Sequence, residues 1–237
     1  MVAATVPELM FGCWRRAWIE FADGSRDDTT TVVWLQTESA MADVRIAADR
    51  AASLRDRAGL RDCTVDELRA IAAVDASSGF TECGPVEIAD DGTRTATAEW
   101  HTRGFGVNFQ PVSAFPEPGL MSWNDDGTVM TERAPSGAYV EEWRLVPGSR
   151  EHLSVIQVDD ETMYRAGPIA VFVRDRRVGI PRPARLLELL EDHADDRPMV
   201  EALLDCEFSV AELTGDRWMI TASTMPWREG EVLDVDG

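Results

Sequence analysis

The chain has 237 residues, of which 44% are hydrophobic and 28% are charged, an ordinary balance for a globular protein with a substantial core. Its formal net charge of −20 excludes nucleic acid as an expected partner, because phosphate binding requires a basic surface. The same charge disfavours anionic membranes, and no apolar run approaches the roughly 18 residues of a membrane-spanning helix. We therefore expect an acidic, soluble protein.

The composition also argues against several kinds of cofactor chemistry. The sequence contains no lysine, which excludes a Schiff-base lysine, a pyridoxal-phosphate anchor and a P-loop. The three histidines form no H-x-H or H-E-x-x-H motif, and the four cysteines form no C-x-x-C pair. The N-terminus lacks a basic segment before its short apolar patch, which argues against a secretory signal. We expect no metal, no cofactor and reduced thiols in a cytoplasmic protein.

Strand signals dominate the first half of the chain. Thr64, followed three residues later by Glu67, predicts a capping box at the start of a helix that ends before Gly79. Three prolines within residues 111–118 predict a connection that neither a strand nor a helix crosses. Alternating or β-branched segments predict strands at residues 14–21, 29–37, 42–46, 86–88, 93–103 and 105–110.

The second half repeats this style. Residues 183–194 carry a wide leucine stripe and predict a helix, and residues 198–204 predict another helical segment. The predicted fold class is mainly β and antiparallel, in two halves, residues 1–115 and 116–237, packed as one compact unit. The length suits one large β-barrel or sandwich, or two small fused barrels. Short strands are predicted at residues 120–123, 128–133, 137–146, 153–158, 163–165, 169–174, 177–180, 206–213 and 218–224.

Successive side chains of a strand point to opposite faces, so the sequence predicts which polar residues share a face with aromatic ones. Two mixed faces stand out. On one, an arginine lies between two indoles, and on the other a glutamate lies within an aromatic stripe. The candidate ligand-binding residues on these and similar faces are Trp14, Arg16, Trp18, Trp34, Gln36, Tyr139 and Trp143.

Charged residues on such faces are candidates for catalysis. If the protein performs chemistry, we expect Glu141 or Asp43 as the acid–base group, since burial raises the pKa of a carboxyl that no arginine pairs with. His101 would be the proton partner, and Arg45 or Arg103 would stabilise an anion. The simpler alternative is that these residues form ion pairs that join neighbouring strands.

Four groups of motifs are distinctive along the chain. They are residues 28–37 with 42–46, residues 100–103 with 108–111, residues 139–144, and residues 224–230. Together they resemble a largely uncharacterised family of bacterial proteins with fungal relatives. That family is similar to lipocalins in architecture, with two β-barrel-like halves. The resemblance therefore implies a lipocalin-like antiparallel β-barrel fold, with residues 1–115 and 116–237 as the two barrel-like halves, and no settled activity. Ala47 stands where the family pattern often has proline.

Three hypotheses remain open. The first is a barrel whose lumen binds a small apolar or aromatic molecule. The second is an enzyme of the same shape that performs cofactor-free acid–base catalysis, such as isomerisation, hydration or cyclisation. The third is a non-catalytic structural or interaction protein with solid barrels. A lumen cavity above roughly 300 Å³ separates the first two from the third. The sequence leaves the ligand and the oligomeric state open.

Overall fold

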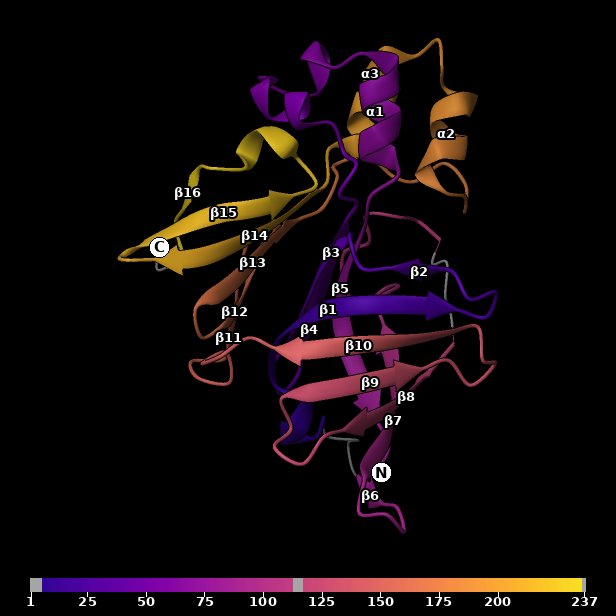
Figure 1. The fold of residues 1–237 in the computed structure, drawn as a ribbon. Coiled ribbons are helices and arrows are strands. Elements are labelled where there is room, and N and C mark those ends of the chain that lie inside the picture. The colour runs from indigo at the N-terminus through magenta and orange to yellow at the C-terminus, as the bar shows by residue number, and fades with distance from the viewer. Residues whose placement is uncertain (1–5, 113–116, 236–237) are drawn as a thin grey trace.

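A computed structural model describes residues 6–112 and 117–235, and they form a mainly β protein (Figure 1). Eight antiparallel strands close into a barrel because the last of them, β10, pairs with the first, β1. Each remaining strand pairs with the next barrel strand in the chain, which is the order of an up-and-down barrel. The barrel strands are β1 (Gly12–Phe21), β3 (Thr31–Gln36), β4 (Met41–Ile46), β5 (Asp75–Cys83), β7 (Arg94–His101), β8 (Gly119–Trp123), β9 (Val129–Arg133) and β10 (Tyr139–Leu145).

The predicted fold class is confirmed, but the barrel takes strands from both sides of the expected boundary between halves. Strands β8, β9 and β10 follow that boundary in the chain, yet they complete the barrel that β1 begins. The boundary itself, between residues 115 and 116, lies outside the described residues, as do the first five residues of the N-terminal segment. The division into two halves stays a prediction.

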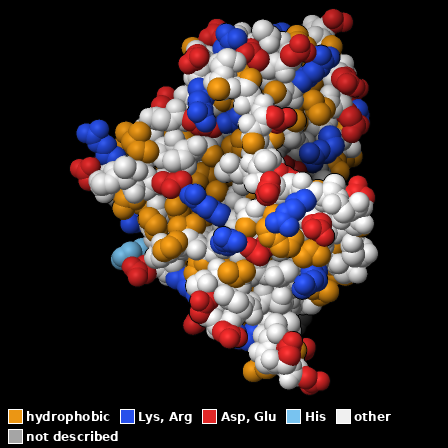
Figure 2. Space-filling model, viewed as in Figure 1, with side chains coloured by type: hydrophobic (Ala, Val, Ile, Leu, Met, Phe, Trp, Pro, Cys, Tyr) orange, Lys and Arg blue, Asp and Glu red, His pale blue; other side chains and the backbone are white. Residues whose placement is uncertain are grey.

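A second antiparallel sheet follows the barrel, and its strands pair in chain order from β11 to β16. Figure 2 shows hydrophobic side chains gathered over this sheet, while charged side chains of both signs are spread over the rest of the visible face. Its strands are β11 (Ser154–Val158), β12 (Glu161–Ala166), β13 (Ile169–Arg174), β14 (Glu207–Thr214), β15 (Arg217–Ser223) and β16 (Val232–Leu233).

Three short α-helices gather at one end of the molecule (Figure 1). The capping box predicted at Thr64 is confirmed, because its side chain accepts from the Glu67 amide and the Glu67 carboxylate accepts from the Thr64 amide. No helix in the described part of the chain is both long and apolar enough to cross a bilayer. The helices and minor strands are α1 (Val65–Ala72), α2 (Leu186–Asp192), α3 (Arg197–Leu204), η1 (Glu8–Met10), η2 (Ala52–Asp56), η3 (Leu60–Asp62), η4 (Pro226–Arg228), β2 (Arg26–Asp27) and β6 (Glu87–Ile88).

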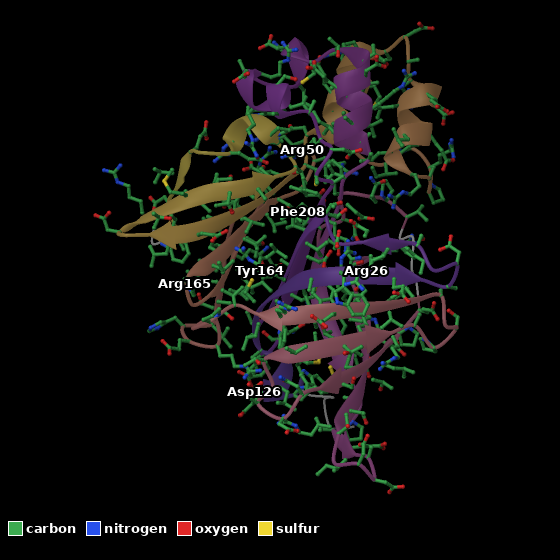
Figure 3. All side chains as sticks on the ribbon, in the orientation of Figure 1. Arg26, Arg50, Asp126, Tyr164, Arg165 and Phe208 are labelled. Carbon is green, nitrogen blue, oxygen red and sulfur yellow. The ribbon has the colours of Figure 1, made fainter. Side chains whose placement is uncertain are left out.

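The largest core lies outside the barrel, between its wall, the second sheet and the helices. Strand β4 shows why: Ala42, Val44 and Ile46 belong to this outer core, whereas the alternate residues face the lumen. Tyr164 on β12 and Phe208 on β14 belong to the same core and lie on the side of the second sheet that meets the barrel (Figure 3). The main hydrophobic core of the protein therefore does not lie inside the barrel.

Two expected strands are absent. Residues 177–180, after β13, form a bend and irregular backbone instead of the predicted strand. Residues 105–110 form turns with a single bridge between Asn108 and Ser77, rather than the predicted strand. Gly106 packs so closely on β5 that an added Cβ would lie 2.2 Å from the Ser78 carbonyl oxygen. The segment thus crosses the end of the barrel instead of extending its wall.

Candidate functional site

One end of the barrel is filled by side chains. A 3₁₀ turn, η1, places Met10 there, fully buried, and the Trp14 indole donates to the Met10 carbonyl at 2.8 Å. Trp123 and Met130 pack into the same cluster. This end of the lumen is therefore closed by an apolar plug.

The other end is hollow. A cavity of about 960 Å³ opens there, within the roughly 300–1,000 Å³ range of small-molecule sites. The hypothesis of solid barrels does not describe this end of the lumen. The cavity is lined by Arg16, Ile19, Trp34, Met41, Asp43, Arg45, Asp75, Ser77, Glu99, Trp100, His101, Thr102, Arg103, Phe105, Asn108, Gln110, Val112, Glu117, Pro118, Glu132, Tyr139, Glu141 and Trp143.

Arg16 and Glu141 form a buried ion pair across the seam that closes the barrel. Arg16 donates to Glu141 Oε1 at 3.0 Å and to Asp27 Oδ2 at 2.7 Å. The side chains of Arg16 and Glu141 are 6% and 2% exposed. Burial opposes ionisation of Asp27, but hydrogen bonds from Thr30 and Thr29 outweigh it and hold the Asp27 pKa well below its usual range. Arg16 is thus held between two carboxylates.

A second ion pair lies on β4, where Asp43 and Arg45 both face the lumen. Arg45 Nε donates to Asp43 Oδ1 at 2.7 Å, and a terminal nitrogen of Arg45 lies 3.8 Å from Glu141 Oε1. Burial works against the Arg45 charge, but Asp43 and then Glu141 outweigh it and raise the pKa of Arg45. The two arginines and their carboxylates therefore form one connected network.

Glu132 is the important residue that the sequence interpretation missed. It lies opposite Glu141 in the β9–β10 pairing and is 4% exposed. Its two carboxyl oxygens accept from the Tyr139 hydroxyl at 2.9 Å and the Trp143 indole nitrogen at 3.2 Å. Among the described residues, no arginine or histidine forms an ion pair with Glu132. Alternation with Met130, another inward residue of β9, is the sequence signal that marks it.

Burial gives Glu132 a protonation state unlike that of an exposed carboxyl. Burial first, and then the nearby Glu141 charge, raise the pKa of Glu132 to about 8, against hydrogen bonds from Tyr139 and Trp143 that favour the anion. Burial first, and then the Glu132 carboxyl that accepts its hydrogen bond, raise the pKa of Tyr139. Glu132 is therefore mostly protonated at neutral pH, so it can donate as well as accept a proton.

Tryptophans form an aromatic wall beside these carboxyls. Trp34 meets Trp143 edge to face, with ring centroids 5.8 Å apart, and meets Trp100 in the same way at 6.1 Å. The Trp34 indole nitrogen is buried and has no hydrogen-bond partner among the described residues. A buried indole N–H normally finds an acceptor, so the wall offers an unused donor.

His101 and Arg103 lie at the mouth of the cavity rather than in the ion-pair network. The His101 ring stacks on Phe80 with centroids 4.7 Å apart, and its Nε2 lies 3.2 Å from Glu82 Oε2. Arg103 is exposed in the turn that follows β7. The expected catalytic residues are therefore divided: Glu141, Asp43 and Arg45 lie together, and His101 and Arg103 lie apart from them. Their catalytic roles stay predictions.

The prediction that Trp14, Arg16 and Trp18 share one face is wrong at Trp18. A bulge in β1 shifts the register between Arg16 and Trp18, so Ile19, rather than its neighbour, lines the lumen. Trp18 lies outside the lumen, and the Arg26 guanidinium stands 4.4 Å from its ring centroid. The sequence shows alternation but does not show where one extra residue interrupts it.

Two other expected ligand-binding residues are buried outside the cavity. Trp14 belongs to the apolar plug. Gln36 is fully buried, accepts from the Thr81 hydroxyl at 2.6 Å and donates to the Thr37 carbonyl at 2.8 Å. The cavity is lined by the other four expected residues, Arg16, Trp34, Tyr139 and Trp143.

Comparison of the chain with models of known protein families, with curated proteins and with solved structures finds no match. The barrel that the family resemblance implied is present, and membership of that family stays a prediction. The evidence for function is therefore the site itself: a closed antiparallel barrel with one plugged end and one hollow end.

Proposed function

We propose that the hollow end of the barrel binds a small aromatic or apolar molecule that carries a polar group. The observation that carries this proposal is the cavity of about 960 Å³ beside Trp34 and Trp143. Ligand sites are typically concave and mostly apolar, with a few fixed polar groups. Here the tryptophans supply apolar surface, and Glu132 with the Trp34 indole supplies hydrogen-bonding groups.

The test is a thermal-shift screen with neutral aromatic probes, namely indole, 2-naphthol and tryptophol. A probe at about 100 times its Kd stabilises the folded protein by about 2.7 kcal/mol, which raises the Tm by several degrees. Ser77→Trp places a large side chain in the cavity, because Ser77 lines it. Ser122→Trp is the matched control, since Ser122 alternates with the buried Met121 and Trp123 and so faces outward.

We expect Ser77→Trp to abolish the Tm shift and Ser122→Trp to preserve it. Silence of every probe with the wild-type protein would contradict binding of this ligand class. An equal response of the two variants would place binding outside the lumen.

A second candidate function is cofactor-free acid–base catalysis in the same cavity. Its support is the protonated Glu132 directly across from the ion-paired Glu141. Enzymes use two carboxyl groups with different pKa values as acid and base. The measurement is hydrogen–deuterium exchange at the α-carbon of 2-tetralone in D₂O, followed by NMR. We expect the wild type to accelerate the exchange and Glu132→Gln to lose about 100-fold of that acceleration. Equal exchange in buffer and enzyme would argue against it.

A further inference from the structure

The charges around the cavity are unbalanced toward the negative. Arg16 and Arg45 are the cations of the connected network, and they face four carboxyl groups. Three of these carboxyls, those of Asp27, Asp43 and Glu141, contact an arginine directly. Glu132 is the remaining carboxyl, and its partners are the neutral Tyr139 and Trp143 groups. Two arginines thus face three paired carboxylates, and Glu132 is the fourth carboxyl, which has no cation of its own in the network.

The groups that face Glu132 from neighbouring strands explain why no protein side chain supplies this cation. From β10 it meets Tyr139 and Glu141, and from β8 it meets Gly119 and Met121, which carry no charge. Arg45 on β4 acts on Glu132 only through space, because its hydrogen bonds go to Asp43. Arg16 on β1 is occupied by Asp27 and Glu141.

We propose that the ligand is an organic amine, whose ammonium group pairs with Glu132 while its apolar or aromatic body lies along Trp34 and Trp143. This proposal rests on the proposed function and names its ligand class. A buried carboxylate is stable when a cation pairs with it, and the faces of aromatic rings attract ammonium groups. An anionic ligand would instead add a further negative charge beside Glu132, where the two buried arginines, Arg16 and Arg45, are already paired.

Binding of the ammonium form requires the loss of one proton. The free protein holds Glu132 as the neutral acid, and the bound complex holds carboxylate against ammonium, so the displaced proton goes to solvent. Because the Glu132 pKa is raised to about 8, affinity must rise with pH below that value. It must stop rising above it, and it falls once the amine itself deprotonates near about 10.4.

The experiment compares three probes with one indole body and different head groups: tryptamine, tryptophol and indole-3-propionic acid. Isothermal titration at pH 7.5 should give tryptamine an affinity about tenfold or more above tryptophol, since a bond to a charged partner is worth that factor. Indole-3-propionic acid should bind most weakly. Titration at pH 7 in buffers of different ionisation enthalpy should show release of close to one proton per tryptamine and none per tryptophol.

Glu132→Gln removes the charge and keeps the shape of the side chain. We expect this variant to bind tryptamine no better than tryptophol, because the charge that distinguishes the two probes is gone. Proton release in the wild type is an independent measurement if the variant fails to fold.

Equal binding of tryptamine and tryptophol, or binding without proton release, overturns the amine proposal and leaves lumen binding intact. Tighter binding of the carboxylate probe also overturns it. Failure of all three indoles overturns the amine proposal, and lumen binding fails with it only when the neutral screen and its Ser77→Trp comparison are negative as well.

Discussion

Glu132 and Glu141 occupy facing positions on neighbouring strands, but these two buried carboxyls have different hydrogen-bond partners. Arg16 contacts Glu141 directly, whereas Glu132 has only neutral donors. Desolvation therefore dominates at Glu132 and favours its protonated form. The difference arises from which strand each arginine lies on, and this is the physical basis of the proposed chemistry.

Glu132 makes the folding stability depend on pH. Its pKa is raised to about 8 in the folded protein and is about 4.3 in an unfolded chain. Its contribution is therefore fully present below the unfolded value and is lost as pH rises through 8. Relative to Glu132→Gln, wild type should lose about 1.4 kcal/mol of unfolding free energy per pH unit between pH 5 and 8. Urea unfolding of both proteins at several pH values measures this, and parallel pH profiles would contradict it.

Arg16 should be far more important for stability than an exposed arginine of the same barrel. Arg16→Met leaves Glu141 buried without its nearest cation and should cost about 3–5 kcal/mol. Adding Glu141→Gln should recover part of that loss, which a double-mutant cycle measures. Arg144 pairs with Glu142 on β10 with a 69% exposed side chain, so Arg144→Met should change stability by less than about 1 kcal/mol. Equal losses at the two arginines would refute the buried network.

For single residues, the sequence predicted the face of a strand on which a side chain lies wherever the strand alternates regularly. It predicted that Arg16 and Glu141 share strand faces with aromatic residues, and both line the cavity together with Trp143. It did not predict Glu132, because β9 is short and no aromatic residue in this strand marks the face that the glutamate shares. The pairing of particular charges depends on strand register, which a single sequence does not fix.

At the scale of elements, irregular segments decide the shape of the lumen. The bulge in β1 turns Trp18 outward and Ile19 inward, and the turn around Gly106 covers part of the mouth instead of forming a strand. Regular elements were predictable, as the capping box at Thr64 illustrates. Bulges and close backbone contacts depend on tertiary neighbours, so the sequence alone did not predict these two.

The turn at the mouth provides a test of this close packing. Gly106→Ala should displace the turn, because the new Cβ would clash with the Ser78 carbonyl, and overpacking of this kind costs about 1–3 kcal/mol. Gly179 is exposed with nothing within 4 Å of an added Cβ, so Gly179→Ala should stay within about 0.5 kcal/mol of wild type. Chemical denaturation measures both, and an unaffected Gly106→Ala protein would contradict the packing described.

For the whole molecule, the main core lies between the barrel wall and the second sheet, and this arrangement leaves the barrel free to be hollow. The outward faces of β3, β4 and β5 join that core, while an apolar plug closes one end of the lumen. The mainly β class was predictable from strand patterns, and the family resemblance implied the barrel. The hollow was not, because alternation shows which side chains face inward but not whether they fill the space.

The central claim is that this lumen holds a ligand, and the most direct measurement is a crystal structure of the protein with the tightest-binding indole probe. We predict electron density for the probe inside the barrel, against Trp34 and Trp143, with its polar head beside Glu132. A lumen closed by repacked side chains, or a probe bound only on the outer surface, would contradict the claim.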